Sequence, residues 1–301
     1  MSRIALAALT NRDLSMLAMV YAYDGCTTDH LWARFFVSLG ARSSCYRRVA
    51  WLSSSGFLQA TRLPSCTGIG SGKQFLSIGP TGRAVLAEFL AIPLAELRRN
   101  TRTRVPRLLD HHLAICRTRL AIELASLRSR VFRLESWLTD FDMHRSPIRV
   151  DDPSLGRPVP VIPDGALVLS MGTAGEQVFY LEQDLDSVSP KRMRIKLRLY
   201  YLARGQQAPV LFVTRNKNRQ TAILQWAEEA ARAEHRDPTI IWTTTESQLS
   251  PQSVLKGTIW AIAGGPNGVA LEDLALGRYV KQQAEIGGRG EDRRGQGGGV
   301  A

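Results

Sequence analysis

The stretch from residue 159 to residue 201 constrains the fold of this chain most, because it contains two short apolar runs that a turn separates. Residues 166–170 form the first run, residues 178–181 form the second, and residues 172–175 (Gly-Thr-Ala-Gly) lie between them. Apolar runs joined by a Gly-containing turn predict a β-hairpin. A helical pattern that carries Lys196 and Tyr200 follows from Pro190 to Ala203.

Three carboxylates would meet at the strand ends of this hairpin. Asp164 precedes the first strand, and Glu182 and Asp184 end the second. Mg²⁺ takes oxygen ligands and keeps waters for phosphate chemistry. We therefore predict Asp164, Glu182 and Asp184 as ligands of Mg²⁺, and the same three residues with Lys196 as catalytic residues. The alternative is that Asp164 only enters a strand and that Glu182 and Asp184 are solvated acids.

The composition of the 301 residues bounds the class of protein. This length predicts two domains of ordinary size, and a hydrophobic content of 44% is enough for packed cores. No apolar run approaches a membrane span and no convincing cleavage site follows the short apolar N-terminus, so we expect a soluble cytoplasmic protein without a membrane segment. The four cysteines have neither zinc-site spacing nor a disulfide framework.

Positive charge is concentrated in the first third of the chain. The formal net charge is +12, and residues 1–104 hold thirteen Lys or Arg against five acids, a difference of eight. About two thirds of the excess charge therefore lies in this third. Such an asymmetry predicts a polyanionic partner, and together with the order of elements in this third it predicts double-stranded DNA.

The same third shows three helical patterns followed by two strands. The first helix begins at a cap at Thr10 or Asn11, the second runs from a cap at residues 27–29 to Gly40, and the third covers residues 42–54. Strands follow at residues 56–63 and 73–78, and a further helix runs from Thr81 to about Leu97. Three helices and a hairpin predict a winged helix, in which the third helix enters the major groove. The predicted DNA-contacting residues are Arg42, Ser43, Ser44, Tyr46, Arg47, Arg48, Arg62 and Lys73.

The Gly-rich loop before Lys73 is similar to a phosphate-binding Walker A loop in one respect only, its Gly-Lys step. Thr67 stands where that motif has its first glycine, and Gln74 stands where it has a hydroxyl. The following residues also favour a strand over a helix. We interpret the loop as a mobile wing.

The rest of the chain has the pattern of an α/β domain. After a basic connection that ends near Pro106, a helix is predicted over about residues 109–139, either covering a sheet or dimerising. The hairpin, the helix at 190–203, a buried strand at 209–214, a helix at 219–234 and a strand at 238–244 follow. We predict a winged-helix domain with its basic linker at 1–104, a nuclease-like α/β domain at 105–262, and an extension with a disordered Gly- and Arg-rich tail at 263–301.

Several short motifs occur along the chain, and their order carries more information than any one of them. They are residues 9–14 (Leu-Thr-Asn-Arg-Asp-Leu), 46–52 (Tyr-Arg-Arg-Val-Ala-Trp-Leu), 56–58 (Gly-Phe-Leu), 112–114 (His-Leu-Ala), 163–165 (Pro-Asp-Gly), 181–184 (Leu-Glu-Gln-Asp), Lys196 with Tyr200, and 210–214 (Val-Leu-Phe-Val-Thr). In this order the chain resembles the replication-relaxation family of bacterial plasmids and mobile elements. Members look like a winged helix fused to a degenerate PD-(D/E)xK nuclease-like (restriction-endonuclease-like) domain. The resemblance covers roughly residues 9–245.

The resemblance implies a role in plasmid or mobile-element replication and DNA relaxation. Replication or conjugation proteins are partners it would imply. A second copy of the chain is a further candidate partner, through the helix predicted over about residues 109–139. The chain departs from the nuclease pattern at Asp184, where lysine is expected, although some members carry that lysine on the next helix, as Lys191 or Lys196 would here. It also has Leu185-Asp186-Ser187 where family members tend to carry Arg-Gly-Thr.

Two other functions compete with this one. The first is an active Mg²⁺-dependent endonuclease that nicks DNA, with Lys196 positioning the attacked phosphate or water. The second is a winged-helix transcriptional regulator whose C-terminal domain dimerises or senses a ligand. A nicking assay on supercoiled plasmid with and without Mg²⁺ separates the endonuclease from the other two.

Overall fold

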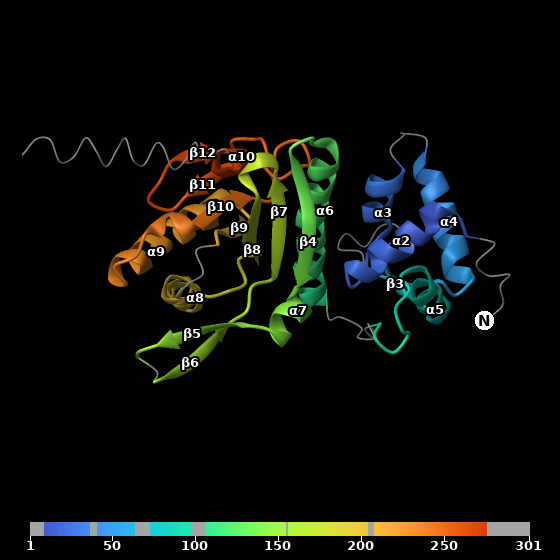
Figure 1. Ribbon diagram of the computed structural model, residues 1–301, viewed down its shortest axis with the longest axis horizontal. Helices are drawn as coiled ribbons and strands as arrows, with labels where there is room; N and C mark the ends of the chain where they lie inside the picture. Colours follow the sequence, from blue (N-terminus) through green and yellow to red (C-terminus); the bar gives the residue numbers. More distant parts are fainter. Residues whose placement is uncertain are drawn as a thin grey trace, which may run out of the picture. The chain divides into compact units, whose positions relative to one another are not determined.

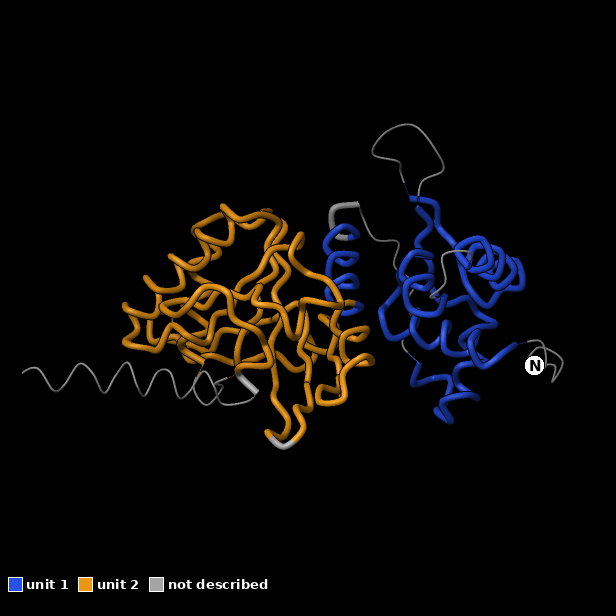
Figure 2. The backbone as a smooth tube through the Cα atoms, turned by 90° about the horizontal axis from the view of Figure 1, so that it is seen from above, with its two compact units in different colours: residues 1–120 blue, residues 121–301 orange. Residues whose placement is uncertain are grey.

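The computed structural model describes residues 9–36, 41–63, 73–97, 106–154, 156–203 and 208–275. The chain divides into two compact units, residues 1–120 and residues 121–301, which are described separately below (Figures 1 and 2). Helices and a large mixed sheet confirm the expected mixture of α and β structure. None of the described helices is long and apolar enough to span a lipid bilayer.

The first unit consists of helices around a small sheet of three strands. Its elements are α2 (Asn11–Ala22), β1 (Cys26–Thr27), α3 (Thr28–Phe35), α4 (Arg42–Ser54), β2 (Leu58–Arg62), β3 (Gln74–Ile78), α5 (Pro80–Phe89) and the first part of α6 (Pro106–Arg128). The strands lie in the order β1-β3-β2, with both pairs antiparallel. The predicted order of three helices and a hairpin is confirmed, whereas α5 ends well before Leu97.

Local sequence explains where two of these helices lie. Thr10 caps α2 in a reciprocal box, because its backbone N–H donates to the Asp13 carboxylate at 2.7 Å and its hydroxyl accepts from the Asp13 N–H at 3.3 Å. In α4 the buried residues Cys45, Val49 and Leu52 recur at helical spacing and form one face. The opposite face of α4 is therefore left to solvent.

The first half of α6 belongs to the first unit and not to a linker or a second domain. A ring nitrogen of His112, Nε2, lies 2.8 Å from the carbonyl oxygen of Gly25, and Arg119 donates to the carbonyl oxygen of Ala22 at 2.7 Å. These contacts attach α6 to the turn between α2 and β1. The compact unit therefore extends past residue 104, and the basic connection at 98–105 lies outside the described residues, as do the predicted wing at 64–72 and the predicted end of the second helix at residues 37–40.

The second unit is built on a seven-stranded sheet in the order β12-β11-β10-β9-β8-β7-β4 (Figure 1). Strands β8, β9 and β10 are parallel, and the other neighbouring pairs are antiparallel. The strands are β4 (Phe132–Thr139), β7 (Gly165–Met171), β8 (Glu176–Asp184), β9 (Val210–Thr214), β10 (Ile241–Thr245), β11 (Trp260–Ile262) and β12 (Asn267–Val269). The helices α8 (Pro190–Leu202) and α9 (Lys217–Ala233) connect the parallel strands.

The predicted hairpin is confirmed as β7 and β8, with Gly165 opposite Leu181. A short 3-10 turn, η2 (Gly172–Ala174), joins the two strands, and Gly172 and Gly175 have positive φ angles of 59° and 81°. Glycine adopts this backbone region without a steric cost, which explains why the turn lies there. Strand β9 is buried along its whole length, as its continuous apolar run predicts.

The predicted helix over residues 109–139 is wrong beyond Arg128. Ser129 breaks it, because its hydroxyl oxygen accepts from the backbone N–H groups of Val131 and Phe132 at 3.1 and 2.9 Å and competes with further helical turns. Ser126 then donates to the carbonyl oxygen of Phe132 and accepts from the N–H of Leu134, so it covers part of the free edge of β4. The apolar residues after 130 thus form a strand.

Three parts of the second unit lie outside the sequence prediction. A separate ribbon of β5 (Ile148–Asp152) and β6 (Arg157–Val161) packs the side chains of Ile148, Val150 and Val161 into the core that contains α8. The remaining short elements are α7 (Asp140–Arg145), η3 (Pro238–Ile240) and α10 (Leu271–Ala275). The sheet continues to β12, past the predicted boundary at 262. The predicted disordered tail from about residue 284 lies outside the described residues.

Candidate functional site

The residues predicted to contact DNA lie mostly on the solvent face of α4. Ser43, Ser44, Tyr46 and Arg47 are exposed there, together with Arg42 at the start of the helix. Arg62 is exposed at the end of β2 and Lys73 just before β3. Helix α4 contains three arginines and no acidic residue, so it presents a positive, hydroxyl-bearing surface.

One carboxylate from α3 reaches this surface. Asp29 Oδ1 accepts from Arg42 Nη2 at 3.1 Å and from the Tyr46 hydroxyl at 3.0 Å. Lys73 Nζ lies 3.9 Å from Asp29 Oδ2. Three of the predicted DNA-contacting side chains therefore converge on Asp29.

Arg48 is placed differently from its neighbours on α4. Its guanidinium forms a bidentate ion pair with the buried Asp13, with Nε–Oδ1 and Nη2–Oδ2 distances of 2.7 and 2.6 Å. It also lies over the Trp51 ring, 4.0 Å from the centroid. Burial raises the pKa of Asp13, but hydrogen bonds from Arg48 and Thr10 outweigh it, and the net pKa is lowered. Arg48 thus holds α4 to α2, whatever else it contacts.

We expect Arg48→Ala to destabilise the first unit, whereas Arg47→Ala should not. Removing Arg48 leaves the Asp13 carboxylate buried without its charged partner, and a hydrogen bond to a charged group contributes about 1.5–3 kcal/mol. Arg47 is exposed and its contact to Ser44 Oγ is long, at 3.4 Å. Urea denaturation followed by circular dichroism measures both variants. Equal midpoints for the two would contradict the structural role of Arg48.

Glu182 lies at the centre of a buried network in the second unit. It is 3% exposed, and its two oxygens accept from Lys196 Nζ at 2.5 Å and from the Tyr200 hydroxyl. Burial, partly opposed by Lys196, raises the pKa of Glu182 to about 7. Burial lowers the pKa of Lys196, but the charges of Glu182 and Asp164 outweigh it and the net pKa is raised.

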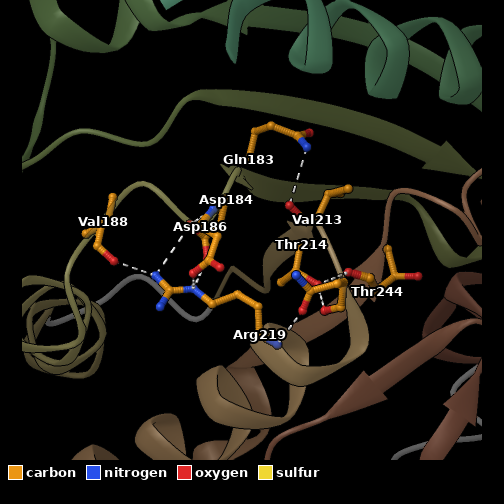
Figure 3. A network of polar contacts seen from close by, with 9 residues as sticks. Gln183, Asp184, Asp186, Val188, Val213, Thr214, Arg219 and Thr244 are labelled. Carbon is orange, nitrogen blue, oxygen red and sulfur yellow. Dashed lines mark hydrogen bonds and ion pairs between the residues drawn. The ribbon is translucent and has the colours of Figure 1, made fainter. Parts of the chain in front are cut away.

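Asp184 belongs to a second buried ion pair, with Arg219 from the first turn of α9 (Figure 3). Arg219 Nε lies 2.5 Å from Asp184 Oδ2 and 3.4 Å from Asp186 Oδ1. Arg219 Nη2 also donates to the carbonyl oxygen of Val188 at 2.8 Å. Arg219 therefore ties the loop after β8 to the start of α9.

The loop after β8 contains a residue with an unusual backbone conformation. Asp186 has a φ of 62°, in the left-handed region that favours glycine. Its backbone N–H donates to Asp184 Oδ1 at 3.0 Å. The hydrogen bond to Asp184 and the ion pair with Arg219 hold an aspartate in this conformation.

The third predicted acid, Asp164, lies near Glu182 but is turned toward the backbone. Its Oδ2 accepts from the Gln183 N–H at 2.8 Å. Across the described ranges, no group of three or more His, Cys, Asp or Glu side chains is arranged to hold a metal ion. Lys196 and Tyr200 bond to the carboxylate oxygens of Glu182, and Arg219 bonds to those of Asp184, so two of the three predicted Mg²⁺ ligands are paired within the protein. The Mg²⁺ site itself stays a prediction.

We expect the stability of the protein to fall as the pH rises from about 4.5 to about 7, in part through Glu182. Its pKa is raised in the folded state, so the folded protein binds a proton there that the unfolded chain has lost, and this contribution disappears above the folded pKa. Glu182→Gln should remove this part of the pH dependence. Melting temperatures across this range test it, with the exposed Glu176→Gln as control. A wild-type pH profile that Glu182→Gln leaves unchanged would contradict the assignment.

Sequence reasoning missed Arg219, Asp13 and Asp29 as partners of the predicted residues. Arg219 lies at the start of a predicted helix, a few residues after a buried strand. An arginine at this position could have indicated an ion pair with an acid at a strand end. Asp13 lies within the motif of residues 9–14, but the sequence does not indicate its pairing with Arg48. Nothing in the spacing of residue 29 and residues 42, 46 and 73 indicates that they meet.

Comparison with known protein families gives a match over much of the chain. The family model described as replication-relaxation matches residues 17–210. No curated protein and no solved structure matches the chain. The matched range begins inside α2 and ends at the first residue of β9, so it includes α4, β2, β3 and the Glu182 network.

Proposed function

The chain belongs to the replication-relaxation family, and from this membership and its α4 surface we propose that it binds double-stranded DNA in the replication and relaxation of a mobile element. The observation that carries the proposal is α4, which exposes Arg42, Tyr46 and Arg47 and has no acidic residue. Exposed arginines and hydroxyls on a helix are suited to base edges and phosphates in the major groove.

We propose that the first unit is a winged helix, with α4 as its recognition helix. The order α2, α3, α4, β2, β3 and the antiparallel pairing of β2 with β3 support this. In β2 only Leu58 is buried and the next four residues are exposed, so its outer surface is open to a DNA backbone. Arg62 at its end would contact phosphate.

A salt titration of DNA binding by the full-length protein tests the proposal. If Arg42, Arg47, Arg62 and Lys73 each neutralise one phosphate, the logarithm of affinity for a duplex should fall with the logarithm of salt with a slope of about −3.6. Fluorescence anisotropy with a labelled duplex measures it. A protein that binds no duplex at low salt would refute the proposed function.

For the second unit, we propose a nuclease-like scaffold that does not cut DNA. The parallel strands β8, β9 and β10 with their connecting helices support a nuclease-like core. The ion pairs of Glu182 with Lys196 and of Asp184 with Arg219 support the loss of cutting, because they neutralise the acids within the protein. The family assignment also supports replication-related proteins as partners.

A nicking endonuclease is the second candidate, because Lys196 and Asp164 both lie within electrostatic reach of Glu182. Incubation of supercoiled plasmid with the protein, with and without Mg²⁺ or Mn²⁺, separates the two. The scaffold predicts unchanged plasmid topology and an unchanged melting temperature with either metal. Nicking that Asp164→Ala or Glu182→Ala abolishes would establish the endonuclease instead.

A further inference from the structure

Asp29 is an acidic residue of the first third of the chain whose side chain reaches the exposed face of α4. Of the five acids in residues 1–104, Asp13 and Asp24 are buried. Glu88 lies on α5 and Glu96 follows it. Asp29 bonds to the exposed side chains of Arg42 and Tyr46 on α4, and its own side chain is 32% exposed.

The contacts of Asp29 are those that a phosphate oxygen pair would make. One carboxylate oxygen accepts from a guanidinium and a phenol, and the other lies 3.9 Å from an ammonium. Donors come from α4 and from the start of β3, far apart in sequence, and they converge on one anion. Guanidinium and ammonium groups are the groups that proteins use for DNA phosphates.

Arg42 is held in this position by aromatic rings as well as by charge. Its guanidinium carbon lies 5.3 Å from the Trp32 ring centroid and 5.8 Å from that of Tyr46. The side chains of Arg42 and Lys73 are 57% and 73% exposed, so their pairs with Asp29 contribute little to folding. The arrangement is therefore better explained by what it does to a ligand than by stability.

We propose that Asp29 takes the place of a DNA phosphate among Arg42, Tyr46 and Lys73 in the free protein, and so limits sequence-independent binding to DNA. This inference rests on the proposed function of the first unit. A duplex that contacts these three side chains must replace Asp29 as their partner. The negative charge of Asp29 then lies beside a DNA phosphate. Like charges at this range repel, and the repulsion weakens with salt.

The test compares full-length wild type with Asp29→Asn on a labelled duplex of random sequence. The substitution keeps the size of the side chain and removes its charge. We expect affinity at low salt to rise about five- to tenfold and the salt slope to steepen by about 0.9 relative to wild type, because Asp29 then no longer offsets one positive charge at the phosphates. Glu88→Gln, which removes the same charge from the exposed surface of α5, should change affinity much less.

Asp29 also lies in the first turn of α3, where a carboxylate can stabilise the helix. If that were its only role, Asp29→Asn would lower the melting temperature and leave DNA affinity unchanged or weaker, which would overturn the inference. In the Arg42→Ala background the gain from Asp29→Asn should shrink, because one of the released donors is gone. An undiminished gain there would also overturn it. If the wild type binds no duplex, the proposed function itself is refuted. If the wild type binds and Asp29→Asn has the same affinity, only the inference about Asp29 is refuted.

Discussion

Replacing Arg42 and Arg47 together by alanine is expected to remove most of the DNA affinity while leaving the fold intact. An arginine on a base edge contributes about 1–3 kcal/mol, and one on a phosphate reduces the salt slope by about one. The two residues lie on the exposed face of α4 and neither makes a buried contact, so the melting temperature should stay close to that of wild type. Anisotropy titrations at several salt concentrations measure both the affinity and the slope.

The matched control for this variant is Arg192→Ala with Arg215→Ala in the second unit. Both arginines are exposed there, and the double replacement removes the same two charges. If net charge alone attracts DNA, the two double variants will lose affinity equally. That result would contradict the assignment of α4 as the recognition surface. It would indicate that the protein binds DNA only through its net positive charge.

Replacing Arg219 by alanine is expected to destabilise the second unit more than any exposed arginine variant. Asp184 and Arg219 are both buried, at 3% and 7% exposure, and removing one partner of a buried ion pair costs about 3–5 kcal/mol. The same change frees the carbonyl oxygen of Val188 from its donor and unties the loop after β8. Thermal and urea denaturation of the full-length protein measure the loss.

Arg194→Ala is the control, because Arg194 pairs with Glu229 on the surface between α8 and α9 and such pairs contribute about 0–1 kcal/mol. Adding Asp184→Asn to Arg219→Ala should recover part of the lost stability, since the unpaired buried charge is then gone. If Arg219→Ala is no worse than Arg194→Ala, the ion pair does not stabilise the unit. The Asp184 site would then be open to another partner, including a cation.

Local sequence was sufficient to predict an element where contacts between residues close together in the chain determine its structure. Helix α4 begins and ends at the predicted residues, since Cys45, Val49 and Leu52 recur at a helical period. The hairpin of β7 and β8 follows from its glycines and apolar runs, and it brings Asp164 near Glu182 as expected. The helix prediction failed after Arg128. Leu134 also fits a helical period, but the hydroxyl groups of Ser126 and Ser129 form hydrogen bonds with the backbone there and the helix ends.

Two structural features were hidden in the sequence because they depend on contacts between distant elements. The ribbon of β5 and β6 packs on α8, whose residues come some forty positions later. Strands β11 and β12 are three residues each, too short for an alternating pattern to identify them. Both depend on the surface against which their side chains pack.

The sequence by itself determined which residues are charged, which segments are apolar, and where the elements with a clear periodic pattern form, together with the concentration of basic residues in the first third. Only the tertiary structure decided which charges neutralise one another. Helix α8 brings Lys196 and Tyr200 to Glu182, and α9 brings Arg219 to Asp184. Likewise Arg47 and Arg48 are adjacent and chemically alike, yet only Arg48 faces Asp13. The physical reason is that an ion pair acts over a few ångströms in space, and the packing of elements distant in sequence sets that distance.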